Sequence, residues 1–483
     1  MKIPKEIKEI GKKLEKAGYE GYLVGGSVRD ALLKKKPKDW DVATDAEPKK
    51  ITEIFKNSYS DNDFGTVTVL TGSEDPTLKE VEITPYRTEE DYRDRRHPEK
   101  ISWAKKIEDD LSRRDFTVNA IAIEISTEKT KDPFSGKDDL EKEIIRAVGD
   151  PEERFSEDAL RLIRAVRFAT VLEFKIEEKT KRALKKKADL LEEISMERIR
   201  DEFLKIMMDK NAATGVEALR RVGFLKYIIP ELEEGYGIDQ NKHHIYDCYE
   251  HSILSLKYAA EEGYNMHVRM AALLHDIAKP EVKEGEGEEA TFYNHEVVGA
   301  RQADKILKRL KFSNKDRKKI VKLVRYHLFY YNVGEVSESS VRRLVRNVGK
   351  ENIDDLIKVR KADRIGSGVP KAEPYKLRHL QYVIEKVSRD PISTEMLEVD
   401  GKDVMEIAEI DPGPEVGFIL TVLLGEVLSD PKKNKAEELE KRIKELAQMD
   451  RKKLKELAEA SRKSIENVET KRDEMTKKKY WVS

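Results

Sequence analysis

Two glycines and two aspartates near the N-terminus have the types and spacing required for phosphate and metal chemistry. Gly25 and Gly26 follow the apolar run Tyr22–Val24, and adjacent glycines let a backbone approach a phosphate closely. Asp39 and Asp41 are two residues apart, so on a strand both carboxylates point to the same side. Like charges held together are unfavourable unless a cation lies between them, and Mg²⁺ commonly takes one or two carboxylates together with substrate phosphates.

Glu82 offers a third carboxylate on a later predicted strand, whose neighbours Val81 and Ile83 face the other way. Two metal ions in such a site can activate a hydroxyl group and stabilise a leaving pyrophosphate. For an isolated Asp-x-Asp pair a solvated turn is the better interpretation. The Gly-Gly turn and the third carboxylate favour a catalytic site in which Asp39 and Asp41 bind Mg²⁺ and Glu82 assists or acts as base.

A second group of possible metal ligands lies in the middle of the chain. A lone histidine on an apolar face is usually a hydrogen-bonded core residue, but four histidines and two aspartates in helical segments favour a metal site. Imidazole and carboxylate ligands suit a divalent transition metal such as Mn²⁺, Ni²⁺, Fe²⁺ or Zn²⁺, or a mixed pair. The group consists of His251, His275, Asp276, His295, His327 and Asp363.

The elements that position these residues follow from the apolar pattern. Residues 1–150 alternate strand-like runs with helices, which predicts an α+β domain with a mixed sheet. After Pro151 the pattern is helical to the end of the chain, and Ser156 is a candidate N-cap. The predicted strands are Tyr22–Val24, Thr66–Leu70, Val81–Thr84 and Phe116–Ile123.

Breaks and shifts in composition predict four domains. We expect a catalytic head at 1–150, a helical neck at 151–232, a histidine-rich metal-binding domain at 233–390, and a helical body with a basic tail at 391–483.

The composition excludes some classes of protein. Of 483 residues, 39% are charged, but 94 Lys+Arg and 95 Asp+Glu nearly cancel, so net charge gives no argument for nucleic acid. The single cysteine, Cys248, permits neither an internal disulfide nor a cysteine-based zinc site. The N-terminus lacks the apolar stretch of a signal peptide, and no run of 18 apolar residues occurs, so a cytoplasmic protein is expected.

Five short motifs follow one another along the chain: Gly25-Gly26-x-Val28-Arg29-Asp30 with Asp39-x-Asp41, Arg113–Ala120, Asp132–Leu140, Glu157-Asp158-x-x-Arg161 and Ser195–Ile199. In this order they resemble the class II nucleotidyltransferases, the CCA-adding enzymes and bacterial poly(A) polymerases with a polymerase-β-like head. The resemblance implies tRNA, CTP and ATP as partners and leaves the oligomeric state open. The nucleotide-binding residues that it implies are Gly25, Gly26, Arg29, Arg114, Asp115, Asn119, Asp158, Arg161 and Arg164.

Asp158 and Arg161 are three residues apart, so on one helix they would share a face. A carboxylate accepts from an exocyclic amino group, and a guanidinium donates to a ring nitrogen or a carbonyl oxygen. Cytosine and adenine present an amino group beside a ring acceptor, whereas uracil and guanine present an oxygen that would face the carboxylate. The pair could therefore accept C and A. A surface salt bridge is the alternative for an isolated pair.

A charged stretch between Glu82 and Arg113 indicates which nucleotides the chain is expected to add. Tyr86–Glu89 and Arg93–Pro98 resemble the flexible loop of complete CCA-adding enzymes, which relatives that add only C tend to lack. An A-adding enzyme or a poly(A) polymerase stays open as an alternative.

The histidine-rich segment resembles the HD phosphohydrolase superfamily. His251, His275, Asp276 and Asp363 match its core set, His295 and His327 match the extra ligands of two-metal members, and Lys279 is a candidate phosphate ligand. The segment Gln240–Asp247 also fits HD-containing nucleotidyltransferases. The resemblance implies a phosphatase or 2′,3′-cyclic phosphodiesterase activity. An alternative of another class is an HD phosphohydrolase that uses an inactive head only to bind RNA.

Overall fold

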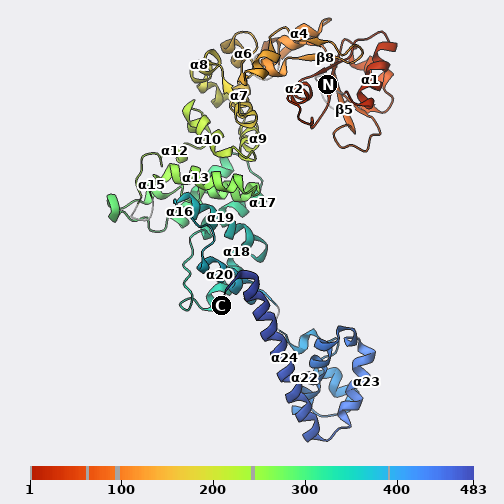
Figure 1. Ribbon diagram of the computed structural model, residues 1–483, viewed down its shortest axis with the longest axis vertical. Coiled ribbons are helices and arrows are strands. Elements are labelled where there is room, and N and C mark those ends of the chain that lie inside the picture. Colours follow the sequence, from red (N-terminus) through yellow and green to blue (C-terminus); the bar gives the residue numbers. More distant parts are fainter. Residues whose placement is uncertain (1–2, 61–64, 93–97, 241–244, 390–391, 483) are drawn as a thin grey trace. The chain divides into compact units, whose positions relative to one another are not determined.

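The computed structural model describes residues 3–60, 65–92, 98–240, 245–389 and 392–482. The chain forms two compact units, one made of residues 1–328 and 354–370, the other of residues 329–353 and 371–483 (Figure 1). The four domains expected from the sequence are a finer division, and their boundaries stay a prediction. None of the described helices is long and apolar enough to cross a membrane.

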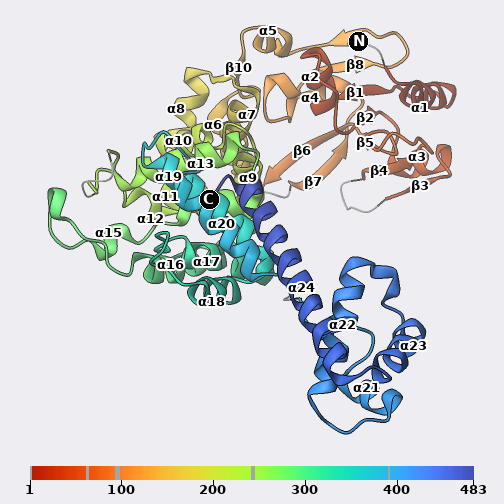
Figure 2. The same cartoon turned by 60° about the horizontal axis from the view of Figure 1, so that its bottom comes forward.

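The head is built on a seven-stranded mixed sheet in the order β3-β4-β5-β2-β1-β8-β9 (Figure 2). Among the described strands of this sheet, β2 and β5 are the one parallel pair, and the other neighbours are antiparallel. The strands are β1 (Tyr22–Val24), β2 (Asp41–Thr44), β3 (Ser58–Tyr59), β4 (Val67–Leu70), β5 (Glu80–Pro85), β8 (Ala122–Glu124) and β9 (Thr130–Lys131). The head helices are α1 (Lys5–Lys16), α2 (Gly26–Leu32), α3 (Pro48–Ile54), α4 (Ile107–Ser112), η1 (Thr117–Asn119) and α5 (Gly136–Glu141). The mixed-sheet head predicted from the sequence is confirmed.

The sheet register brings the predicted catalytic segments together. β1 and β2 are antiparallel, so Val24 at the end of β1 lies opposite Asp41 at the start of β2. β2 and β5 are parallel, and Asp41 is aligned with Glu82. Because aligned residues on neighbouring strands share a face, the carboxylates of Asp41 and Glu82 lie side by side, with Asp41 next to the turn that begins at Gly25.

The strand predicted over Phe116–Ile123 is wrong for its first part. Residues Thr117–Asn119 form the 3₁₀ helix η1, and only Ala122–Glu124 is a strand. The Asp115 carboxylate accepts from the backbone N–H of Phe116 and from the side chain of Asn119, which favours a local turn over strand pairing.

The neck consists of helices, as expected, with one short strand pair. Ser156 is not an N-cap: the first helix begins at Pro151, and Asp150 caps it by accepting from the N–H groups of Glu152 and Glu153. Ser156 lies in the last turn and donates to the carbonyl of Glu152. The elements are β10 (Ile144–Ile145) paired with β11 (Lys175–Ile176), α6 (Pro151–Glu157), α7 (Leu160–Leu172), α8 (Glu178–Lys186), η2 (Ala188–Glu193), α9 (Met196–Met207), α10 (Ala212–Arg221), α11 (Leu225–Ile228) and α12 (Pro230–Glu233).

The histidine-rich segment is a helical bundle whose central helix, α14, is mostly apolar but includes the buried Arg269. Every residue from Val268 to Leu274 is buried, as expected for a helix surrounded by others. The elements are α13 (Cys248–Glu261), α14 (Met266–Leu274), α15 (Lys279–Val282), η3 (Gly287–Glu289), α16 (His295–Arg309), α17 (Asn314–Tyr326) and α19 (Ile353–Gly366).

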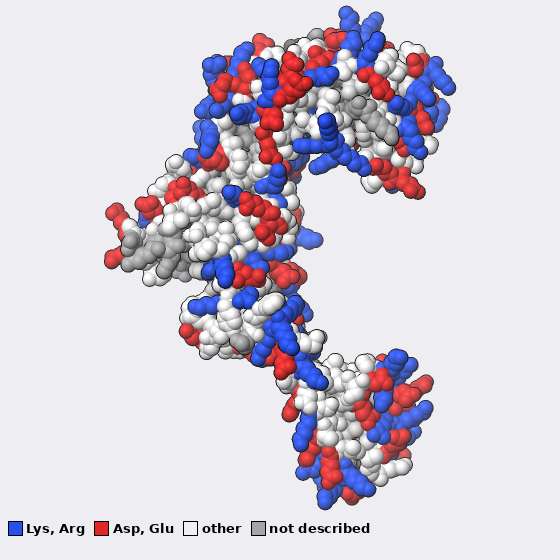
Figure 3. Space-filling model, viewed as in Figure 1, with Lys and Arg blue, Asp and Glu red and all other residues white. Residues whose placement is uncertain are grey.

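The second unit has its own apolar core around α22, with Ile419, Val422 and Leu423 buried. Its elements are α18 (Glu338–Val348), η4 (Lys350–Asn352), α20 (Tyr375–Val387), η5 (Thr394–Met396), α21 (Gly401–Ala408), α22 (Pro414–Ser429), η6 (Pro431–Lys433), α23 (Ala436–Ala447) and α24 (Arg451–Tyr480). On the face drawn in Figure 3, charges of both signs are interspersed over both units, in keeping with the near-zero net charge.

Gly215 of α10 packs so closely against two other neck helices that no side chain fits. A Cβ there would lie 2.4 Å from Cγ2 of Ile206 and 2.9 Å from Cγ2 of Thr170. We expect Gly215→Ala to lower the free energy of unfolding by about 1–3 kcal/mol, in spite of the helix preference of alanine. Gly299→Ala in α16 is the matched control, since its Cβ would meet nothing closer than 3.5 Å. Urea unfolding followed by circular dichroism checks this, and equal stability of the two variants would contradict it.

Candidate functional site

The turn after β1 combines three of the predicted nucleotide-binding residues with one of the predicted catalytic carboxylates. Gly25 has φ +69°, a conformation that favours glycine, and it caps α2, which begins at Gly26. A Cβ at Gly25 would lie 3.0 Å from Nη1 of Arg114 and 3.6 Å from Oδ2 of Asp41. The guanidinium of Arg114 and the carboxylate of Asp41 therefore both face this turn.

The carboxylates of the head are crowded, although they do not all lie on one strand. Asp39 precedes β2, so the expected strand pair Asp39–Asp41 is wrong in that detail, while Asp41 begins the strand. Burial raises the pKa of Asp41 to about 7, and the charges of Asp39 and Glu82 add to this, against a lowering by Arg114. A divalent cation would relieve this repulsion, so the donor set fits Mg²⁺.

The oxygens of Asp39, Asp41 and Glu82 do not converge as closely as the ligands of the second site. Within the described part of the chain, three or more ligand atoms within 4.8 Å of one another occur only among the histidines and aspartates of the HD-like segment. An ion in the head would therefore take further ligands from substrate phosphates or water, as Mg²⁺ usually does.

A buried carboxylate holds Arg114 in place. Asp110 of α4 is 1% exposed and accepts from two guanidinium groups, 2.6 and 3.0 Å from Arg113 and 3.0 and 3.3 Å from Arg114. Burial alone would raise the pKa of Asp110, but the two arginines outweigh it and lower the pKa. Asp110 thus fixes the segment from which Arg114 reaches the Gly25 turn.

Four of the predicted nucleotide-binding residues form one hydrogen-bonded chain. Arg29 donates to Oδ1 of Asn119 at 2.8 Å, and Asn119 donates to Oδ1 of Asp115 at 3.1 Å. Arg164 of α7 donates to Oδ2 of Asp115 at 2.6 and 2.8 Å. Burial would raise the pKa of Asp115, yet Arg164 and the hydrogen bond from Asn119 hold it at about 2. The head and the neck are joined by this carboxylate.

Three guanidinium groups gather around the ring of Phe168. The carbons Cζ of Arg29, Arg164 and Arg167 lie 5.2, 5.3 and 4.0 Å from its centroid. Glu202 pairs with Arg167 at 2.6 Å. Each of the three guanidinium groups has its own carboxylate partner, Asp30 for Arg29, Asp115 for Arg164 and Glu202 for Arg167, so the cluster is close to neutral.

Asp158 and Arg161 do not share one helical face, so the geometry expected for them is wrong. Asp158 lies between α6 and α7, where it accepts from the N–H of Leu160 and from Arg198 at 3.3 and 3.4 Å. Arg161 is buried and donates to Glu157 at 2.5 Å and to the carbonyls of Arg154 and Arg113 at 3.0 Å. Asp158 is thus paired with Arg198, while Arg161 ties the neck to the Arg113–Arg114 segment.

The second site is centred on the buried carboxylate of Asp276, which follows α14. Its Oδ2 lies 3.2 Å from Nε2 of both His251 and His275, and its Oδ1 lies 3.4 Å from Nε2 of His295 and 3.5 Å from that of His327. Each oxygen thus faces its own pair of imidazoles. The structure brings together all the ligands predicted here.

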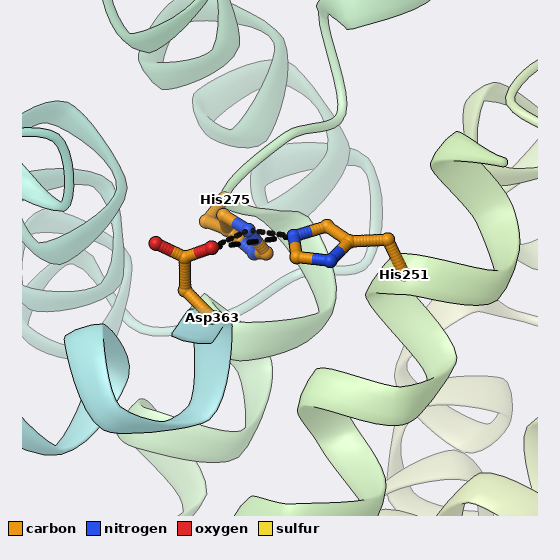
Figure 4. A group of neighbouring side chains, drawn as sticks. All are labelled: His251, His275 and Asp363. Atoms are coloured by element: carbon orange, nitrogen blue, oxygen red, sulfur yellow. Dashed lines mark hydrogen bonds and ion pairs between the residues drawn. The ribbon is translucent and has the colours of Figure 1, made fainter. Parts of the chain in front are cut away.

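Asp363 of α19 completes the first of these two half-sites. Its Oδ1 lies 3.4 Å from Nε2 of His251 and 3.6 Å from that of His275, and the two imidazole nitrogens are 2.9 Å apart (Figure 4). Two triads whose ligand atoms lie within 4.8 Å of one another result: His251, His275 and Asp363, and His275, Asp276 and His327.

Backbone carbonyls orient three of the imidazoles. Nδ1 of His275, His295 and His327 lies 2.9, 2.7 and 2.7 Å from the carbonyl oxygen three residues earlier. A proton on Nδ1 leaves Nε2 free to ligate a metal, which is the usual support of a metal-bound histidine.

The electrostatics of the centre fit a cation. Burial would raise the pKa values of Asp276 and Asp363, but the surrounding imidazoles hold both well below the usual range, with help from Lys279 for Asp276 and from Arg360 for Asp363. Burial would lower the pKa of His275, yet Asp276 raises it to about 10. The buried, ionised carboxylates are stabilised by positive charge next to them. A donor set of imidazole nitrogen and carboxylate oxygen fits a divalent transition metal.

Some residues of these sites were not assigned from the sequence. Asp110 and Arg360 lie three or four residues from their partners, a helical spacing that could have indicated both ion pairs. Arg198 belongs to the fifth motif, but its partner Asp158 is 40 residues away, and no local pattern predicts that pair. Of the loop at Tyr86–Pro98, residues 93–97 lie outside the described residues, as do Asn241–His244 of the Gln240–Asp247 segment.

Three family models match successive parts of the chain. The "Poly A polymerase head domain" matches residues 21–146, the "Probable RNA and SrmB- binding site of polymerase A" matches residues 173–235, and the "HD domain" matches residues 248–367.

The similar curated relatives and solved structures are CCA-adding enzymes. The chain is 50% identical over 194 residues to a CCA-adding enzyme of Lactobacillus helveticus, covering 40% of this chain and 47% of that protein. It is 44% identical over 240 residues to one of Enterococcus faecalis, covering 49% and 58%. The aligned part thus spans about half the length of these relatives. The crystal structure of the Bacillus stearothermophilus CCA-adding enzyme in complex with CTP is similar at 27% identity and a TM-score of 0.57, over 92% of this chain and 98% of that one.

The raised pKa of Asp41 predicts pH-dependent binding of Mg²⁺. A proton and the cation compete for the same carboxylate, so with a pKa of about 7 the affinity for Mg²⁺ should rise about tenfold between pH 6 and pH 8. Folding stability without the metal depends on pH in the opposite direction. A folded-state pKa of Asp41 above the unfolded value stabilises the fold at low pH, and this contribution is lost as the pH rises through 7. Calorimetric titration of the wild type and of Asp41→Asn isolates the effect. Equal affinities at the two pH values would refute it.

Proposed function

Because the chain belongs to the family of CCA-adding enzymes and poly(A) polymerases with an HD domain, we propose that it adds CCA to the 3′ end of tRNA from CTP and ATP without a template. The observation that carries the proposal is the sheet register that sets Asp41 beside Glu82 and beside the Gly25 turn with Arg114. A cytoplasmic location belongs to the same proposal.

In the proposed head reaction the chain's own residues hold and orient the nucleotide. Gly25, Gly26 and the N-terminus of α2 present backbone N–H groups to the triphosphate, and Arg29 and Arg114 neutralise its charge. Asp39 and Asp41 would hold Mg²⁺, and Glu82 would assist or accept the proton of the 3′-hydroxyl. Two Mg²⁺ ions in such a site supply activation of the hydroxyl group and stabilisation of the leaving pyrophosphate.

Asp158 is the proposed reader of the base. Its Oδ1 accepts from the N–H of Leu160 at 3.1 Å, while Oδ2 has the longer contact with Arg198 at 3.4 Å. An exocyclic amino group of cytosine or adenine could donate to this carboxylate, whereas the oxygen of uracil or guanine would meet it without a hydrogen bond. Arg161 is occupied by Glu157 and by two backbone carbonyls, so we assign it a positioning role. Arg198, which contacts Asp158, is better placed than Arg161 to donate to the base.

The loop after Glu82 supports complete CCA addition over addition of C alone, while an A-adding enzyme or a poly(A) polymerase is the alternative that the incorporation assay decides. β6 (Arg87–Tyr92) and β7 (Pro98–Trp103) pair as an antiparallel hairpin, separate from the main sheet and adjoining Tyr86, which is buried in the head core. A hairpin that begins directly after β5 is well placed to act on the nucleotide site, as the resemblance to the loop of complete enzymes suggests.

The HD centre is proposed to be a second, hydrolytic site. Two half-sites that share Asp276 match a pair of divalent transition metal ions such as Mn²⁺, Ni²⁺ or Fe²⁺. Such ions supply an activated water for attack on a phosphoester. The protein positions the histidine and aspartate ligands and keeps the histidines in one tautomer. The expected substrate is a phosphomonoester or a cyclic phosphodiester at an RNA end.

An incorporation assay tests the function and separates the rivals. A tRNA that lacks CCA should accept C from CTP alone and complete CCA when ATP is added; acceptance of A alone would indicate an A-adding enzyme or a poly(A) polymerase. Asp39→Ala should reduce incorporation by at least about 100-fold, since one metal ligand is lost, while HD-dependent hydrolysis is kept. Glu53→Ala, an exposed carboxylate of α3, is the matched control.

The converse variant, His275→Ala, should lose hydrolysis and keep incorporation. A wild-type protein that hydrolyses phosphoesters but incorporates neither nucleotide would establish the rival in which the head only binds RNA.

Asp158→Ala should lower fidelity more than rate. Without the carboxylate, UTP and GTP lose the oxygen–oxygen clash, so their incorporation relative to CTP should rise by roughly tenfold or more, the value of one buried polar mismatch. Sequencing of the 3′ ends formed in mixed nucleotides measures this, with Asp189→Ala, an exposed carboxylate of η2, as the control. Unchanged fidelity would remove Asp158 from base selection.

A further inference from the structure

A buried carboxylate of α9 faces the arginine cluster around Phe168. Glu202 is 3% exposed, and its Oε2 lies 2.6 Å from Nε of Arg167. Its Oε1 lies 2.8 Å from Nζ of Lys205, whose side chain is 54% exposed. Water screens an exposed ammonium group, so the lysine contributes little to holding a buried charge. Arg167 is therefore the main partner of Glu202.

Arg167 lies close to a second guanidinium group of the same helix. Arg164 precedes it by three residues on α7, so the two side chains share a face. The Cζ atoms of Arg164 and Arg167 lie 5.3 and 4.0 Å from the centroid of the Phe168 ring. Burial lowers the pKa of Arg167 against the opposing charge of Glu202, and the charge of Arg164 lowers it further. Two like charges beside one ring are stable only if each has its own carboxylate.

The two carboxylates that pair with these arginines act on both of them. Asp115 pairs with Arg164, with 2.6 Å between Oδ2 and Nη2. Burial would lower the pKa of Arg164, but the charges of Asp115 and Glu202 raise it. The charge of Asp115 also raises the pKa of Arg167. If Glu202 lost its charge, Asp115 would have to neutralise two guanidinium groups instead of one.

A second guanidinium at Asp115 would disturb the head. Oδ1 of Asp115 already accepts from Asn119, and Asn119 accepts from Arg29 of α2. Arg29 and Asn119 are among the residues proposed to bind the nucleotide. Competition for Asp115 would therefore be transmitted through these hydrogen bonds to the proposed triphosphate site.

Contacts at both ends of α9 oppose a shift that would bring Glu202 another partner or remove it from Arg167. Near the start of the helix, Arg198 contacts Asp158 at 3.3 Å. At its end, the carbonyl of Met207 accepts from the buried Arg269 of α14 at 2.8 Å. Glu202 lies between these two contacts, on a helix that is held in place from both sides.

We propose that Glu202 is a positioning residue for nucleotide binding. By holding Arg167, it leaves Asp115 to the hydrogen-bonded chain that ends at Arg29. The inference rests on the proposed nucleotidyl transfer for its purpose, but the binding of a nucleotide can be measured without turnover.

The test is calorimetric titration of the full chain with CTP and with ATP, in the presence of Mg²⁺ and the absence of RNA. Glu202→Gln keeps the size of the side chain and removes its charge. It should weaken the binding of both nucleotides about tenfold or more, the effect of one lost charge-assisted hydrogen bond. In incorporation assays the same variant should raise KM for both nucleotides more than it lowers kcat. The choice of base should stay unchanged, in contrast to Asp158→Ala, because the defect concerns the triphosphate.

A second substitution distinguishes charge from packing. Arg167→Met removes the guanidinium that Glu202→Gln leaves without its partner, so the double variant should bind both nucleotides within about threefold of the wild type. Glu202→Asp keeps the charge and should also stay within about threefold. If packing alone were at stake, the double variant would be at least as weak as Glu202→Gln.

Two further variants are controls. Lys205→Ala removes the exposed partner of Glu202 and should bind as the wild type. Leu323→Ala truncates a buried side chain of α17 in the HD bundle, and it should lower the free energy of unfolding without weakening nucleotide binding.

Equal binding by Glu202→Gln and the wild type would overturn the proposal, as would a double variant as weak as the single one. Nucleotide binding that depends on Glu202, in a protein that incorporates no nucleotide, would uphold the positioning role and refute the proposed function.

Discussion

Carboxylates that are removed from water need positive partners, and this requirement organises both sites of the protein. Asp110 and Asp115 in the head and Asp276 and Asp363 in the HD domain are all buried. Each is satisfied by groups from other turns or other helices, such as Arg114, Arg164 or the imidazole ring of His275. Where no arginine suffices, as at Asp41, the carboxyl group has a raised pKa and is ready to exchange its proton for a cation.

The same pairing links the head to the neck. Asp115 accepts from Asn119 of the head and from Arg164 of α7, and Arg161 of α7 donates to the carbonyl of Arg113. The proposed triphosphate site and the proposed base site are therefore parts of one hydrogen-bonded framework. A change in the position of α7 would be transmitted to both sites, which would suit an enzyme that must choose a base before it joins it.

The HD domain differs from the head, because four of its six candidate ligands lie at the ends of helices. His275 and Asp276 follow α14, His295 begins α16 and His327 follows α17. At a helix end the side chain can turn into the centre while Nδ1 meets a carbonyl of the last turn or of the preceding loop. The bundle thus supplies rigid supports, and the carboxylate of Asp276 connects the two halves of the centre.

The sequence by itself determined the mixed-sheet head and predicted the chemistry. The candidate catalytic carboxylates Asp39, Asp41 and Glu82 and the six candidate HD ligands follow from residue types, periodicity and ordered motifs, because these are local properties of the chain. Only the tertiary structure decided which charges meet. Asp158 pairs with Arg198 and not with its neighbour Arg161, and Phe116–Asn119 turns away from a strand because Asp115 accepts from its backbone and side chains. The Asp158–Arg198 pair joins segments 40 residues apart, which no local pattern contains, whereas the turn at Asp115 is a local contact that the strand-like pattern of Phe116–Ile123 concealed.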